Sequence, residues 1–167
     1  MQPDFTILTG FFDDNADLRD EYTTLSEPAH PEAKKLLAFW NGRPADGLVI
    51  GRDVPSRGVA SLLSNISIYE PIDEGRDFRV RVAGASIRRR FGRDITGKLF
   101  SELYPPEDFQ HHLESTRQIL ESSQPKIIDS RLCSGNVEKL HLEVVILPVF
   151  APNRIDKWVL AGLFYFH

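Results

Sequence analysis

The sequence predicts an α+β fold: a five-stranded antiparallel sheet with helices on one face and an additional N-terminal helix. Three observations lead to this prediction. The expected elements follow the order strand, strand, short helices, long helix and three strands. The turn at 134–136 suits a hairpin between two of the last three strands. The last strand, 158–166, is apolar on both faces, which is typical of a central strand.

The composition is that of a globular domain. The chain has 167 residues, of which 41% are hydrophobic and 26% charged, enough to bury a core. Its net charge of −4 provides no overall attraction to nucleic acid or to an anionic membrane. The single cysteine, Cys133, excludes an internal disulfide and fits a reducing compartment. No apolar run approaches the roughly 20 residues that span a bilayer, and signal-peptide features are absent, so we expect a cytoplasmic protein without membrane contact.

Residues 1–29 are expected to form an acidic arm, with seven acidic residues and one basic residue, Arg19. The apolar residues near its front are compatible with docking on the domain or on a partner, and a mobile terminus is an equally weighted alternative. The segment 13–17, DDNAD, is similar to the start of a calcium-binding loop. Leu18 and Thr24 occupy the positions that require glycine and glutamate, so calcium binding is rejected.

Residues 30–61 are expected to contain a helix at 31–43 followed by a loop. Proline and glutamate in its first turn favour this start, and a glycine near its end favours the stop. Its apolar stripe, together with the outer face of the sheet, is expected to form a homodimer interface. The stripe consists of Leu36, Leu37 and Trp40.

Residues 62–167 hold the predicted sheet and the remaining helices. Apolar and basic residues alternate along 78–82, as in a strand with one buried face. Two prolines start the long helix, and its apolar residues share one face. The strands are expected at 66–72, 78–82, 126–133, 139–150 and 157–167, and the helices at 85–92, 95–104 and 105–124.

The run RVAGASIRRRFGRDITGKLFSELYPPEDFQ, residues 81–110, resembles the pattern of PAS sensory domains. An alanine follows the second strand, a glycine comes about seven residues later, and isoleucine-x-glycine-lysine opens the next helix. The resemblance extends from about residue 62 to 166. The segments LLAFWNGR and FRVRVAG are similar to a bacterial subgroup of largely stand-alone PAS proteins. Two departures are Gly84, where the family often has asparagine, and the absence of the Asp-Ile-Thr that ends many PAS domains.

The resemblance implies a stand-alone sensory module that acts through protein contacts. It also implies a pocket between the sheet and the helices, which either holds a small organic ligand or stays without one. The alternative is that these residues simply fill the core. His111 and His112 lie on the helix that supplies the haem ligand in oxygen-sensing PAS proteins, but solvated histidines are the favoured interpretation and haem is not expected. The pocket residues are Ile87, Phe91, Ile95, Phe100, Phe109, Leu113, Leu132 and Leu142.

The segment 76–98 carries eight of the 20 Lys and Arg residues. It contains GRDITGKL, which lacks the strand before it and the hydroxyl after lysine that a phosphate-binding loop requires. The overall acidity favours contacts with protein over nucleic acid. Enzyme signatures such as G-x-S-x-G and H-E-x-x-H are absent, so no enzyme is expected. A small enzyme or carrier with a polar cavity, or a ligand-free adaptor, remains the alternative function.

Overall fold

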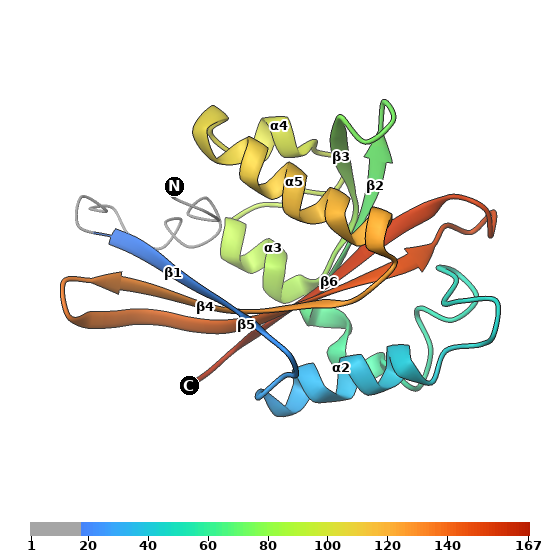
Figure 1. Ribbon diagram of the computed structural model, residues 1–167, viewed down its shortest axis with the longest axis horizontal. Helices are drawn as coiled ribbons and strands as arrows, with labels where there is room; N and C mark the ends of the chain where they lie inside the picture. The colour runs from blue at the N-terminus through green and yellow to red at the C-terminus, as the bar shows by residue number, and fades with distance from the viewer. Residues whose placement is uncertain (1–17) are drawn as a thin grey trace.

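The computed structural model describes residues 18–167 and contains one six-stranded antiparallel sheet (Figure 1). The strand order is β1-β4-β5-β6-β2-β3. The last strand therefore lies between β5 and β2, which confirms the prediction of a central position. The strands are β1 (Leu18–Leu25), β2 (Ile66–Ile72), β3 (Asp77–Ala83), β4 (Lys126–Ser134), β5 (Val137–Phe150) and β6 (Lys157–Tyr165).

The predicted number of five strands is wrong, because the chain forms an additional strand, β1, inside the acidic segment. β1 pairs antiparallel with β4, from Leu18 opposite Ser134 to Leu25 opposite Ile127. Its sequence, LRDEYTTL, is polar and lacks the alternation of a buried strand, as suits an edge strand with most side chains exposed. The front part of the arm, for which docking and a mobile terminus were both left open, lies outside the described residues.

The helices lie on both faces of the sheet (Figure 1). The three helices between β3 and β4 cover one face, and the N-terminal helix covers the other. In the described part of the chain, no helix is long and apolar enough to cross a membrane. The helices are α2 (Pro31–Asn41), the short 3₁₀ helix η1 (Ala60–Asn65), α3 (Ala85–Phe91), α4 (Phe100–Leu103) and α5 (Pro106–Ser122).

β6 supplies buried side chains to a core on each face of the sheet, as its apolar sequence predicts. Val159, Ala161 and Leu163 belong to the inner core, which lies beneath α3, α4 and α5. Residues that alternate with them, including Leu160 and Phe164, belong to the outer core, which lies beneath α2 and the loop that follows it. Both faces of this central strand are therefore covered by its own chain.

The residues predicted to form a dimer interface pack against their own sheet. Leu36 is fully buried and Trp40 is 5% exposed, while Leu37 is partly buried against the same core. The indole N–H of Trp40 donates to the carbonyl of Pro148 at 2.8 Å. A Cβ on Gly162 would lie 2.5 Å from Leu36 Cδ2, so the glycine permits α2 to approach β6 closely. The outer face of the sheet thus needs no second subunit to cover it.

A buried glutamate on β5 fixes the start of α2. Glu143 has no exposed surface, and its two carboxyl oxygens accept from the backbone N–H of Ala29 at 2.9 and 3.0 Å. The N–H of His30 donates to the same carboxyl group at 3.0 Å. The His30 ring then caps the helix, because its Nδ1 accepts from the N–H of Glu32. These contacts attach the outer layer to the centre of the sheet.

Candidate functional site

The eight residues predicted to line an internal pocket come together in the inner core. Six are buried, and Phe91 and Phe109 are partly buried against the same cluster. They come from α3, the loop after it, α4, α5, β4 and β5, so the predicted convergence of these elements is present. The six buried members are Ile87, Ile95, Phe100, Leu113, Leu132 and Leu142.

Aromatic rings fill the centre of this cluster. The ring of Phe100 lies 5.0 Å from that of Tyr69, 5.3 Å from that of Phe78 and 5.5 Å from that of Tyr104, measured between centroids. Phe78 is fully buried and Phe100 is 3% exposed. Rings at these separations and tilts are in contact, and they occupy the space between the sheet and α4 with the chain's own side chains.

His111 and His112, for which haem ligation is not expected, extend this series of rings toward β1. The ring of His112 stacks on Tyr104 at 3.8 Å with an interplanar angle of 16°. His111 lies 5.5 Å from His112 and stacks on Tyr22 of β1 at 5.7 Å. Burial, with a smaller contribution from the charge of His111, lowers the pKa of His112 to about 3, so its imidazole is neutral near pH 7. Burial also lowers the pKa of His111, followed by the effect of the Lys126 charge.

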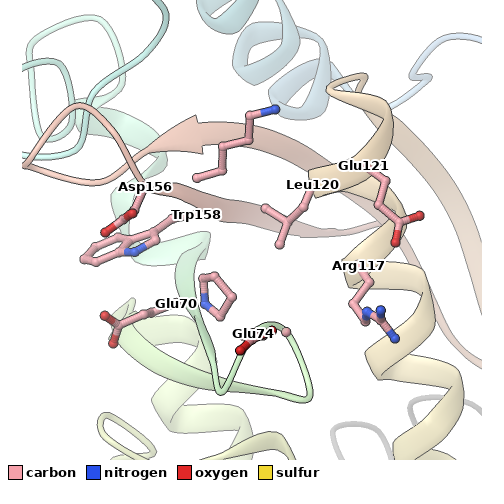
Figure 2. Close-up of a pocket in the computed structure, with 10 residues that line it drawn as sticks. Glu70, Glu74, Arg117, Leu120, Glu121, Asp156 and Trp158 are labelled. Atoms are coloured by element: carbon pink, nitrogen blue, oxygen red, sulfur yellow. The ribbon is translucent and has the colours of Figure 1, made fainter.

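A surface cavity of about 460 Å³ lies where α5, the β2–β3 turn and the beginning of β6 meet (Figure 2). None of the eight predicted pocket residues lines it. In Figure 2, Arg117 and Glu121 project from α5 on one side, Trp158 and Glu70 lie on the opposite side, and Glu74 lies on the turn between them. The lining residues are Glu70, Pro71, Glu74, Gly75, Arg117, Leu120, Glu121, Asp156, Lys157 and Trp158. We call this the rim cavity.

The β2–β3 turn determines where Glu74 sits. Asp73, Glu74 and Gly75 all have positive φ, at 52°, 60° and 83°. The N–H of Gly75 donates to the carbonyl of Ile72 and the N–H of Arg76 to that of Asp73, which closes the turn. A Cβ on Gly75 would lie 3.7 Å from Arg117 Nε, so this turn packs against α5. The turn lies between the strands that the sequence predicts at 66–72 and 78–82.

The charges around the rim cavity are unequal. Four acidic and two basic side chains line it, which leaves an excess of two negative charges. Both basic side chains already have partners away from the cavity lining. Arg117 lies 3.9 Å from the Glu114 carboxylate, and Lys157 Nζ donates to Ser123 Oγ at 2.9 Å.

The acidic side chains of the rim cavity differ in their partners. Glu70 pairs with Arg81 at 3.7 Å, and Asp156 accepts from Asn153 Nδ2 at 2.7 Å. Within residues 18–167, the carboxylates of Glu74 and Glu121 have no hydrogen-bond or ion-pair partner. Two exposed carboxylates are therefore available to a ligand at this site.

A family model described as a PAS domain matches residues 29–164. The chain belongs to the PAS domain family. The match begins before α2, so it includes the outer layer as well as the sheet and the inner helices. Membership indicates a sensory or signalling module. We found no significant match among curated proteins or among solved structures.

Sequence reasoning missed the rim cavity. Its lining comes from three segments, 70–75, 117–121 and 156–158, which are distant in the sequence and converge only in the fold. Their polar residues belong to turns and an exposed helix face, where no spacing pattern distinguishes a binding residue from a solvated one.

Proposed function

We propose that this PAS module signals through contact with a partner protein and receives its signal at its surface. The observation that supports the proposal is the packing of the inner core, where the residues expected to line a pocket contact one another. A domain whose interior is filled to this extent has little internal space for a small molecule. A signal therefore has to reach this domain by binding to its surface.

The surface of α3 is the partner-binding face in this proposal. Arg88, Arg89 and Arg93 are exposed, and in the part of the chain that the structure describes none of them forms an ion pair. Three other arginines of the basic segment have partners, since Arg76 pairs with Asp73, Arg81 pairs with Glu70, and Arg79 donates to the carbonyl of Gly97. Clustered free cations on a chain of net negative charge attract an acidic partner and accelerate the encounter.

The test compares the wild type with two double variants in proximity labelling in the native host cell. R88Q/R89Q removes two charges from α3, and K35Q/R57Q removes two exposed charges elsewhere as a matched control. We expect one set of labelled proteins with acidic surfaces that R88Q/R89Q loses and K35Q/R57Q retains. Equal labelling by both variants would exclude α3 as the partner-binding face. The proposal keeps the cytoplasmic location that the single cysteine favours.

A further inference from the structure

We propose that the rim cavity binds a small organic cation, an ammonium or guanidinium group attached to an apolar body. This inference deepens the proposed function by naming the chemical class of the signal, and it rests on that function only for its biological role. Binding itself is a separate property that purified protein displays without a partner.

The apolar part of the rim cavity explains the apolar body of the ligand. Pro71, Leu120 and Trp158 form its floor, and Figure 2 shows Leu120 projecting from α5 toward Trp158. The cavity volume of about 460 Å³ lies within the range of about 300–1,000 Å³ that is usual for small-molecule sites. An aliphatic chain or a single aromatic ring therefore has both the room and the apolar contacts to bind.

The indole of Trp158 favours a positive charge on the ligand. Tryptophan has the most strongly cation-binding ring face among the aromatic residues. The guanidinium carbon of Arg81 already lies 5.6 Å from the centroid of the Trp158 ring, so this indole contacts a cation within the chain. A ligand cation placed between Trp158 and the acidic rim would receive the same kind of attraction.

The partners of the charged side chains decide the sign of the ligand. Arg117 and Lys157 direct their charged groups to Glu114 and Ser123, outside the lining, whereas Glu74 and Glu121 remain open. An anion would meet open carboxylates and engaged cations. A cation would meet two open carboxylates, whereas Glu70 and Asp156, like the two basic side chains, already have partners. The two open carboxylates and the net negative charge of the lining therefore favour a cation over an anion.

The experiment is a titration of the full chain with 2-phenylethylamine, followed by NMR at the Trp158 indole N–H and the Leu120 methyl groups. Two probes of similar shape serve as controls: 2-phenylethanol, which is neutral, and 3-phenylpropionate, which is an anion. We expect saturable shifts at both residues with the amine and none with the anion. Equal saturation by the alcohol, or no saturable shift with the amine, would overturn the proposal.

Matched variants test the role of the open carboxylates. E74Q/E121Q is expected to weaken binding of the amine by roughly 2- to 30-fold, the range that two exposed ion pairs provide. E27Q/E138Q removes two exposed carboxylates elsewhere and is expected to bind like the wild type. Unchanged binding by E74Q/E121Q would show that these carboxylates do not bind the ligand and would refute the assignment.

Two outcomes separate this inference from the proposed function. If a lysine-rich peptide shifts the same signals while 2-phenylethylamine does not, the rim cavity is a docking site for a basic protein segment, and the small-molecule proposal fails. If no cation binds but R88Q/R89Q still loses its labelled partner, the inference fails while the proposed function stands. The ligand titration tests the rim cavity and the labelling experiment tests α3, so a failure of one proposal can be distinguished from a failure of the other.

Discussion

Replacement of Gly84 by alanine is expected to destabilise the protein through a clash between two backbone segments. Gly84 precedes α3 with φ of −63°, a conformation that alanine adopts without strain. The difficulty is space, because a Cβ at this position would lie 2.4 Å from the carbonyl oxygens of both Leu63 and Ser64 at the end of η1. Neither oxygen can rotate away, since both belong to the main chain.

The size of the effect follows from this geometry. Ordinary contacts of a Cβ begin at 3.4 Å, so α3 and η1 have to separate by 3.4 − 2.4 = 1.0 Å. Overpacking of this kind costs about 1–3 kcal/mol, while the loss of glycine's freedom in the unfolded chain returns about 0.4–1 kcal/mol. The difference is a net loss of about 1.3 kcal/mol, within a range of about 0 to 2.6 kcal/mol, which would lower the Tm by about 3–5 °C in a chain of this length. In this chain, an asparagine at position 84, as the PAS resemblance would suggest, would meet the same two oxygens.

Thermal and urea unfolding of G84A, with G42A as the matched control, measure this prediction. Gly42 ends α2 with φ of −87°, and a Cβ there would meet its nearest atoms at 3.6 and 3.8 Å, which are ordinary contacts. G42A is expected to keep or slightly raise the Tm. The reasoning is refuted if G84A unfolds at the temperature of the wild type, or if its loss is no larger than that of G42A.

Two further predictions concern buried polar groups. Because the pKa of His112 is about 3 in the folded protein and ordinarily 6.5, the unfolded chain binds one more proton between these values, and stability falls as the pH drops below 6.5. H112F removes this proton-binding group. Between pH 6 and 4, the unfolding free energy of the wild type, measured by urea denaturation, should therefore fall about 1.4 kcal/mol more per pH unit than that of H112F. Parallel curves of the two proteins would contradict this prediction. E143Q weakens the contacts to Ala29 and His30, so we expect a loss of about 1–3 kcal/mol and faster amide exchange at both residues, with E138Q unchanged; protection equal to wild type would be the opposing result.

Sequence patterns predicted the parts of the fold that depend on apolar residues. The two-faced apolar sequence of 158–166 predicted a central strand, and β6 occupies that position with side chains in both cores. The helix at 31–43 was placed correctly to within two residues, as α2 ends at Asn41. β1 was missed because an edge strand in water needs no apolar alternation, and its pairing with β4 becomes visible only in three dimensions.

The candidate site was harder to predict than the fold. The eight residues named on the basis of the PAS resemblance lie together in the inner core, but the same apolar residue types describe a pocket lining and a packed core. Distinguishing the two requires the positions of rings such as Phe78 and Phe100, which spacing does not provide. The charge that the rim cavity offers to a ligand depends on which of its charged side chains already have partners. Arg117 and Lys157 contact residues outside the lining, while Glu74 has no partner among the described residues. Such pairings are set by the fold and are not visible in a single sequence.

A native mass spectrum of the freshly purified chain, recorded beside a denaturing spectrum, tests most directly whether the signal arrives at the surface. With the inner core filled, we predict that no molecule is retained in the interior. Any excess mass of the wild type should therefore be carried by a smaller fraction of E74Q/E121Q, whose binding at the rim cavity is weakened. An excess mass that is lost on denaturation and is carried to the same extent by the wild type and E74Q/E121Q would show a retained ligand that does not depend on the rim carboxylates, and would contradict a signal received at the rim cavity.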